Sequence, residues 1–264
     1  MFYFTIRNSV KKEFIFGFHA VEALLKKHPE RVLQLYRQKG REDKRIQDII
    51  ELAEYHQIPV LSIAKINCDQ WSDYAPHQGL LAEVKISAQL GEHDLLKLLA
   101  KKQFAVTGSI ETNKAAFLLL LDEVQDPHNL GACLRSANAA GVDAVVITQD
   151  RAAGMTPIVR KVAAGAAEIT PLITVTNLAN TLRQLKKAGV WLYGLDASAT
   201  QCLYNTSLTG PLGLVLGAEG KGLRRLTKEL CDGLMAIPMQ GSVSSLNVPG
   251  AAGICLFEAL RQTQ

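Results

Sequence analysis

The second half of the chain alternates short apolar runs with segments of helical periodicity. The runs AFLLLLDEV, AVVIT, VWLYGLDA and LGLVLGAEG are separated by stretches such as NLANTLRQLKKAG, in which apolar residues recur every three or four positions. Strands that alternate with helices form a parallel sheet with helices on both faces, so the fold class is α/β. Ligands bind such sheets beyond the carboxyl ends of the strands. The loops after AFLLLLDEV, LGLVLGAEG and LMAIPM are therefore candidate sites.

The same patterns divide the chain into four predicted segments. Residues 1–13 are predicted to be an N-terminal extension, and residues 14–85, which mix helical and strand patterns, a small α/β domain. Residues 86–114 are mostly polar, with one short amphipathic piece, DLLKLLAKK, and are predicted to be a linker. Residues 115–264 carry the alternating pattern of the larger domain.

Composition argues against several classes of protein. The longest apolar runs, such as AFLLLL, are far shorter than the roughly 20 residues of a membrane span, so we expect no membrane segment. The five cysteines are scattered through the chain, and no histidine pairs with a cysteine at the spacing of a metal site. This favours a reducing compartment, the cytoplasm, and no bound metal.

A cationic segment lies in the small domain. The stretch RQKGREDKR contains five cationic and two acidic residues, whereas the net charge of the whole chain is only +4. Arginines and lysines of this kind contact RNA phosphates without reading bases, so Arg41, Lys44 and Arg45 are candidate RNA-binding residues. The alternative is an ordinary solvated loop and helix face.

Each of the three candidate loops carries polar side chains. The first, DPHNLGACLRSANAAG, contains Asn129 and Arg135; the second, LGAEGKGLRRL, contains Glu219. The third, GSVSSLNVPG, contains Ser245 and Asn247 just before an apolar helical pattern. Asn247 can hold a ligand, and it can equally cap that helix.

Common nucleotide and hydrolase motifs do not fit these loops. No GxGxxG follows a strand, and GAEGKGL departs from the P-loop pattern because Gly222 stands where Ser or Thr is needed. Ser245 does not lie in a GxSxG elbow and no histidine follows it, which excludes a serine-hydrolase triad of that type.

Taken in order, DPHNLGACLRSANAAGV, LGAEGKGL and GSVSSLNV closely resemble the three signature motifs of the SpoU family of RNA ribose 2′-O-methyltransferases. FGFHAVEALL, GREDKRI and HQGLLAEV resemble the ribosomal-protein-like substrate-binding domain of one branch, which methylates a guanosine of 23S ribosomal RNA. The resemblance implies the SPOUT fold with a trefoil knot, a homodimer, ribosomal RNA as partner and S-adenosylmethionine as cofactor. The implied cofactor-binding residues are Gly217, Ile237 and Leu246, and the implied catalytic residues are Asn129, Arg135, Glu219, Ser245 and Asn247.

The chemistry of these residue types suggests their roles. Gly217 would let the backbone approach, and two aliphatic side chains can sandwich a flat adenine. Arg135 is a poor general base because a guanidinium stays protonated, so we expect it to bind a phosphate and to lower the pKa of the ribose hydroxyl. Glu219 would fix Arg135 or accept the proton, or would only favour a helix start.

Two other functions remain open at this point. A relative that binds RNA but has lost catalysis is disfavoured by the intact set of polar residues, and a tRNA methyltransferase is disfavoured by the front domain. The sequence also departs from the family after SLNV, where Pro249 and Gly250 replace the usual Ser-Val-Ala. We expect this departure to affect the start of the last helix and not the catalytic residues.

Overall fold

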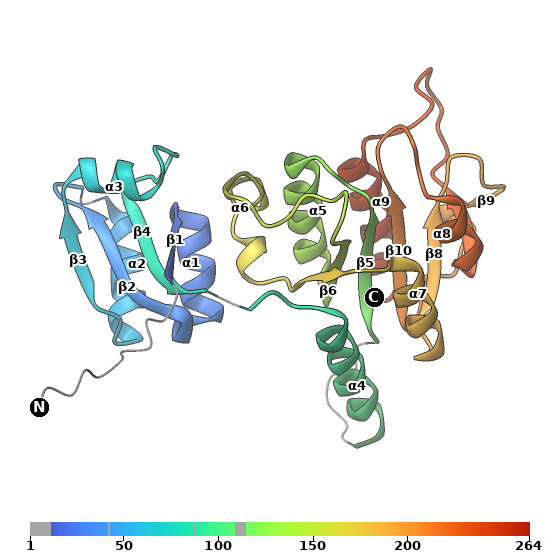
Figure 1. The fold of residues 1–264 in the computed structure, drawn as a ribbon, viewed down its shortest axis with the longest axis horizontal. Coiled ribbons are helices and arrows are strands. Elements are labelled where there is room, and N and C mark those ends of the chain that lie inside the picture. The colour runs from blue at the N-terminus through green and yellow to red at the C-terminus, as the bar shows by residue number, and fades with distance from the viewer. Residues whose placement is uncertain (1–11, 42, 87, 109–114) are drawn as a thin grey trace, which may run out of the picture. The chain divides into compact units, whose positions relative to one another are not determined.

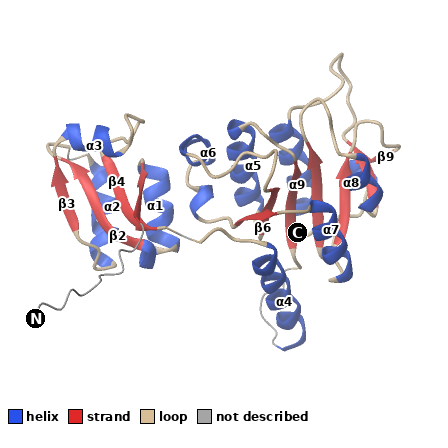
Figure 2. Ribbon diagram, in the orientation of Figure 1, coloured by secondary structure: helices blue, strands red, loops and turns tan. Residues whose placement is uncertain are grey.

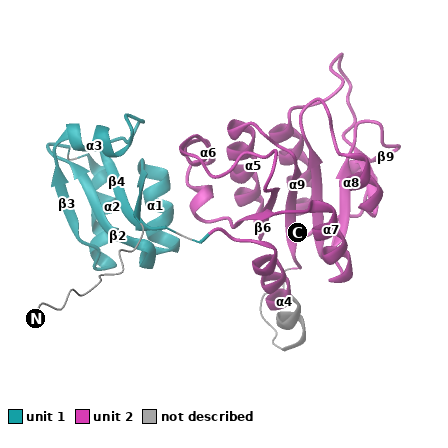
Figure 3. Ribbon diagram, viewed as in Figure 1, with its two compact units in different colours: residues 1–88 teal, residues 89–264 magenta. Residues whose placement is uncertain are grey.

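The computed structural model describes residues 12–41, 43–86, 88–108 and 115–264. They form two compact units, Met1–Ala88 and Gln89–Gln264 (Figure 3). Among the described residues, no helix is long and apolar enough to cross a membrane. The first described strand begins at Lys12, and residues 1–11 of the predicted N-terminal extension lie outside the described residues.

Unit 1 is built on a four-stranded sheet in the order β1-β4-β2-β3. Strand β4 pairs antiparallel with both β1 and β2, while β2 and β3 are parallel. The strands are β1 (Lys12–Phe16), β2 (Val32–Gln38), β3 (Val60–Ile63) and β4 (Leu80–Lys85). The helices are α1 (Phe18–Lys27), α2 (Lys44–Tyr55), α3 (Lys65–Trp71) and the short 3-10 helix η1 (Pro29–Arg31).

The sheet of unit 1 has helices on both faces. Apolar side chains of α1 and α2, among them Leu24 and Ile49, pack on one face. On the other face Cys68 of α3 packs with Tyr36 and Leu81. This arrangement buries the alternating apolar residues of β2 and β4 on both sides.

Unit 2 contains the predicted parallel sheet, which has seven strands in the order β7-β6-β5-β10-β8-β11-β9 (Figure 2). All of its strand pairs are parallel. The strands are β5 (Phe117–Asp122), β6 (Ala144–Thr148), β7 (Leu172–Val175), β8 (Trp191–Leu195), β9 (Gln201–Cys202), β10 (Leu212–Gly217) and β11 (Gly233–Ala236). The late strand β10 lies between β5 and β8.

Helices cover both faces of this sheet (Figure 1). They are α4 (Glu92–Gly108), α5 (Pro127–Ala140), α6 (Pro157–Ala163), α7 (Leu178–Lys187), α8 (Arg225–Leu230) and α9 (Val248–Gln262), with 3-10 helices η2 (Ala166–Glu168) and η3 (Leu203–Asn205). Successive residues of β5 point to opposite faces: Leu119 packs with residues of α5 and α9, and Leu120 with residues of α4 and α7. The run FLLLLD is buried throughout because neither face is open.

The segment predicted as a linker differs from that prediction. Residues 92–108 form α4, and its Leu95 and Leu99 are buried against the same core as Leu118 of β5. The amphipathic piece DLLKLLAKK therefore belongs to unit 2 rather than to a connection. Residues 109–114 lie outside the described part of the chain.

Candidate active site

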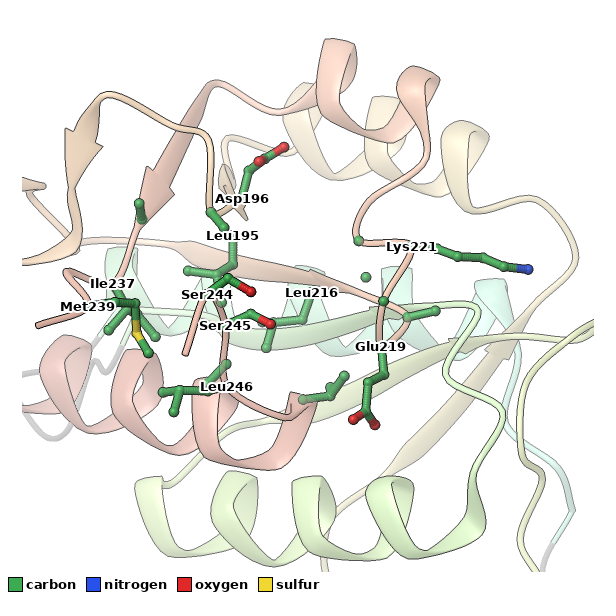
Figure 4. A pocket seen from close by; sticks show the side chains of 18 of the residues that line it. Leu195, Asp196, Leu216, Glu219, Lys221, Ile237, Met239, Ser244, Ser245 and Leu246 are labelled. Carbon is green, nitrogen blue, oxygen red and sulfur yellow. The ribbon is translucent and has the colours of Figure 1, made fainter. Parts of the chain in front are cut away.

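A cavity of about 600 Å³ opens at the carboxyl ends of β8, β10 and β11. Its wall is formed by the segments that follow these three strands and by the start of α9 (Figure 4). The volume lies within the range of small-molecule sites, and the position is the one expected for ligands of parallel sheets.

One part of the wall is apolar. The predicted cofactor residues Ile237 and Leu246 both line the cavity, together with Leu195, Leu216 and Met239. Leu216 is buried at the end of β10, whereas Leu246 is 38% exposed at the opening. Such a surface suits a flat apolar group such as a purine ring.

Gly217 also lines the cavity, but the structure gives a different reason for a glycine there. A Cβ on Gly217 would lie 2.0 Å from the carbonyl carbon of Gly222. The loop returns this closely because the Gly222 amide donates to the Ala218 carbonyl at 2.8 Å and because Gly220 and Gly222 have positive φ. The close approach is thus made by the chain's own backbone, and the glycine shapes the cavity wall.

Glu219 and Asn129 meet although they are far apart in the sequence. The Asn129 Nδ2 atom, in the first turn of α5, donates to Glu219 Oε2 at 3.2 Å. Glu219 lines the cavity and Asn129 lies at its rim as the partner of that carboxylate. The hydrogen bond leaves the Glu219 carboxylate with further acceptor capacity.

The third predicted loop contributes Ser244 and Ser245 to the wall of the cavity. Asn247 instead caps α9, where its Oδ1 accepts from the Gly250 amide at 3.0 Å. A Cβ on Gly250 would lie 2.7 Å from this oxygen. The Pro249-Gly250 departure therefore suits the cap, because proline fits a first helical turn and glycine leaves room for the asparagine. A role of Asn247 in orienting the ribose stays a prediction.

Arg135 does not lie with the predicted site residues that line the cavity. It lies exposed on α5 and is not among the residues that line the cavity. The hydrogen bond found at Glu219 comes from Asn129 and not from Arg135. A long cationic side chain in this position can reach a phosphate outside the cavity.

The sequence patterns did not single out an ion pair that also lines the cavity. Asp196, directly after β8, pairs with Lys228 of α8 and accepts from the amide and hydroxyl of Ser198 at 2.9 and 2.7 Å. The hydrogen bond from Lys228, helped by those from Ser198, lowers the pKa of Asp196 to about 2. Its position after the strand-like run VWLYGL was the available signal.

A second carboxylate fixes the start of α8. Asp122, buried at the end of β5, accepts from Arg224 Nε at 2.8 Å and from the Thr227 hydroxyl at 2.7 Å. The hydrogen bond to Asp122 raises the pKa of Arg224. These contacts hold the loop that carries Glu219 against β5, so Asp122 supports the cavity from outside it.

The cationic residues of the small domain lie near the start of α2. The guanidinium carbons of Arg41 and Arg45 lie 5.4 and 4.8 Å from the centre of the Phe18 ring. Arg45 Nη2 also lies 3.0 Å from Nδ1 of His19, and Lys44 is exposed in the first turn of the helix. The motifs FGFHAVEALL and GREDKRI are therefore adjacent in space.

Family models match both units of the chain. The model of the SpoU rRNA Methylase family matches residues 116–257, and a model described as RNA 2′-O ribose methyltransferase substrate binding matches residues 14–90. The chain belongs to the SpoU rRNA Methylase family. The first match contains every predicted catalytic and cofactor-binding residue, and the second contains the cationic segment.

Curated relatives of the family match over almost the whole chain. A 23S rRNA (guanosine-2′-O-)-methyltransferase RlmB of Shewanella oneidensis is 50% identical over 252 residues, which is 96% of this chain and 98% of the relative. The enzyme of the same description from Escherichia coli K12 is 50% identical over 250 residues, or 95% and 98% of the two chains.

Solved structures show the same fold. The SpoU methyltransferase AviRb from Streptomyces viridochromogenes, in complex with the cofactor AdoMet, has a TM-score of 0.73 and 22% sequence identity. The match covers 96% of this chain and 90% of that one. Among the described residues, no cluster of three or more His, Cys, Asp or Glu side chains could hold a metal ion.

Proposed function

We propose that the chain transfers a methyl group from S-adenosylmethionine to the 2′-hydroxyl of a guanosine in 23S ribosomal RNA. The observation that carries this proposal is the cavity at the ends of β8, β10 and β11, which gathers five of the residues predicted from the SpoU motifs: Gly217, Glu219, Ile237, Ser245 and Leu246. Curated relatives with half of their residues identical act on a guanosine of this RNA.

The residues of the cavity fit the cofactor. Ile237, Leu246 and Leu216 offer an apolar surface for the adenine, and the carboxylates of Glu219 and Asp196 can accept hydrogen bonds from hydroxyl or ammonium groups. When bound, S-adenosylmethionine supplies a methyl group on a positively charged sulfur. The chain must then place the ribose oxygen in line with that methyl carbon, and positioning of this kind lowers a barrier by several kcal/mol.

Glu219 is the proton acceptor in this proposal. Its carboxylate keeps acceptor capacity beside the bond from Asn129, whereas the guanidinium of Arg135 holds its own proton. Ser245 lies on the same wall and can hold a ribose hydroxyl. Arg135, exposed on α5, binds the neighbouring phosphate and stabilises developing negative charge on the ribose oxygen.

The remaining features of the proposal concern the whole molecule. Residues 14–85 bind RNA, with Arg41, Lys44 and Arg45 on phosphates, and residues 115–264 perform the chemistry in the cytoplasm as a homodimer with a trefoil knot. The exposed apolar side chain of Phe257, 48% accessible on α9, supports a surface that a second copy covers. The insertion of β10 between β5 and β8 is compatible with a threaded chain.

The test is methyl transfer followed by mapping of the modified site. Purified chain, labelled S-adenosylmethionine and either 23S rRNA or tRNA transcripts would be incubated, and 2′-O-methyl positions would be mapped in the labelled RNA. The proposal expects a single modified guanosine in 23S rRNA. Label in tRNA alone would favour a tRNA enzyme, and binding without label would favour a silent relative.

A further inference from the structure

The loop that joins α3 to β4, residues 72–79, has an unusual backbone. It contains Asp73, Tyr74 and Gln78 with φ of 51°, 56° and 54°, a left-handed conformation that residues with a Cβ rarely adopt. Strained backbone of this kind persists only where its surroundings hold it, and it is concentrated at functional sites. The loop follows the helix labelled α3 in Figure 1.

Hydrogen bonds hold this loop in place. The Tyr74 amide donates to the Asp69 carbonyl at 2.7 Å, and the buried Ser72 hydroxyl donates to the same carbonyl at 3.2 Å. Buried His77 accepts from the Gly79 amide through Nδ1 at 2.9 Å, which leaves Nε2 to donate to Asp69 Oδ1, also at 2.9 Å. The loop is therefore fixed before any partner arrives.

This fixed loop displays an aromatic ring. Tyr74 is 73% exposed, so neither core packing nor burial explains its place on a strained turn. The side chain borders a cavity of about 430 Å³ that Arg41 and Lys65 also line. The other polar side chains of the wall are those of Gln38, Gln78, His77 and Asp69, and the Asp69 carboxylate is already bonded by His77.

Arg41 is held at the edge of the same cavity. Its Nε donates to Asp43 at 3.0 Å, and its guanidinium lies over the Phe18 ring. A Cβ on Gly79 would lie 2.8 Å from Arg41 Cδ, so the glycine leaves room for this side chain. The guanidinium is thus held beside the cavity by a partly exposed ion pair with Asp43 and by the Phe18 ring.

We infer that this Tyr74 pocket, whose lining includes Gln38, Arg41, Lys65, Tyr74, Gln78 and Gly79, binds one unpaired nucleotide of the RNA substrate. The base stacks on the Tyr74 ring and the adjoining phosphates meet Arg41 and Lys65. Sites for single-stranded RNA combine an exposed aromatic face with cations that follow the backbone, and amide groups can meet base edges. The inference rests on the proposed function, since it requires RNA as the substrate.

The experiment compares three tyrosine variants of the full chain. Tyr74→Ala removes the ring, Tyr74→Phe keeps it, and Tyr55→Ala removes another exposed ring, 81% accessible on α2, that does not line the pocket. Dissociation constants for a 23S rRNA transcript would be measured over a range of salt concentrations. We expect Tyr74→Ala to weaken binding on the order of tenfold, and the other two variants to bind like wild type.

Lys65→Gln tests the phosphate contact independently of the strained turn. Loss of one phosphate contact lowers the slope of log affinity against log salt by about one, whereas loss of stacking leaves the slope unchanged. We therefore expect a smaller slope for Lys65→Gln and a normal slope for Tyr74→Ala. Thermal unfolding of each variant monitors folding.

The outcomes separate this inference from the proposed function. Wild-type affinity in Tyr74→Ala, or an equal loss in Tyr74→Phe, overturns stacking, and an unchanged slope in Lys65→Gln overturns the phosphate contact. Methyl transfer by the same wild-type samples shows that the proposed function still holds in those cases. A wild-type chain that neither binds nor methylates the transcript contradicts both.

Discussion

The carboxyl edge of the seven-stranded sheet carries two cavities with different chemistry. The cavity of about 600 Å³ at β8, β10 and β11 has an apolar wall, whereas one of about 400 Å³ near β5, β6 and β7 is lined mainly by polar and charged side chains. In the second cavity Glu123 already contacts Arg224 at 3.2 Å and Arg151 at 3.5 Å. In the first, Glu219 is bonded by the neutral amide of Asn129.

The contrast shows what turns a strand-end cavity into a ligand site. Both cavities occupy the position that parallel sheets offer to ligands. The first combines an apolar surface with the Glu219 carboxylate, which among the described residues forms no ion pair with a lysine or arginine, so it can take up a flat ligand and a proton. In the second, Arg224 and Arg151 neutralise Glu123, and we interpret this cavity as part of the support for α8.

The largest expected effect comes from Gly217→Ala. Its Cβ would lie 2.0 Å from the Gly222 carbonyl carbon, so the loop that forms the cavity wall must move. Misplacement of a site by about 1 Å costs on the order of a hundredfold in rate, and we expect a comparable loss in affinity for S-adenosylmethionine by calorimetry. Gly154→Ala is the matched control, because no atom lies within 4 Å of its added Cβ. Equal affinity in both variants would show that the wall is not shaped by Gly217.

The next effect concerns Arg135, which lines neither cavity. Loss of an electrostatic contact at a reacting centre costs on the order of a hundredfold to a thousandfold in rate, so Arg135→Ala should lose this much in single-turnover methyl transfer. Arg135→Lys should keep part of the rate because it keeps the charge. Cofactor affinity should not change in either variant.

The pH profile of Arg135→Lys separates the two possible roles of the arginine. A fixed charge predicts a rate ratio to wild type that is flat with pH. A general base predicts a ratio that climbs about tenfold per pH unit, because only neutral lysine could take the proton. The climbing ratio would overturn the role of Glu219 as acceptor.

Asp122→Asn tests whether the contacts beside the second cavity support α8. Asp122 is buried and bonded by Arg224 and Thr227, and removal of its charge leaves Arg224 with Glu123 alone. Because Arg224 is partly exposed, we expect a loss of about 2 kcal/mol in the free energy of unfolding in urea. Arg151→Ala, at an exposed site, should stay within about 0.5 kcal/mol of wild type. A stable Asp122→Asn variant would contradict the supporting role.

The smallest effect is the pH dependence of the Asp196–Lys228 pair. Lys228 and Ser198 lower the pKa of Asp196 from 3.8 to about 2 in the folded chain. A lowered carboxyl pKa stabilises the fold above the unfolded value, and this contribution is lost as the pH falls from about 4 to about 2. With screening at the partly exposed Lys228, wild type should lose about 1 kcal/mol relative to Asp196→Asn over this range. The free energy of unfolding of both proteins would be measured in urea at each pH. An equal change in both proteins over this range would contradict the stabilising role of the pair.

Sequence periodicity predicted the main sheet because a strand covered on both faces leaves an unmistakable apolar run, as in FLLLLD. The sequence predicts a linker where α4 lies, because Leu95 and Leu99 stand in a short amphipathic piece between polar residues. What buries them is a distant core, including Leu118, and local patterns do not show which distant surface a helix will meet.

The sequence indicated only some of the residues of the candidate site, because local patterns do not show contacts between distant elements. The motif residues Glu219, Ser245 and Leu246 reach one cavity because each follows or precedes a core element of the same edge. The bonds of Asp122 to residues more than 100 positions away could not be seen, since they depend on where β5 meets α8. The same holds for the distant partner of Asn129.

Calorimetric titration of S-adenosylmethionine into two matched variants tests the central claim most directly. Ile237→Asp places a charge on the apolar wall of the first cavity, and Leu226→Asp places the same charge in the second. We predict one binding site per wild-type chain, near-complete loss of binding in Ile237→Asp and unchanged affinity in Leu226→Asp. Unchanged affinity in Ile237→Asp together with a loss in Leu226→Asp would contradict the assignment of the cofactor to the first cavity.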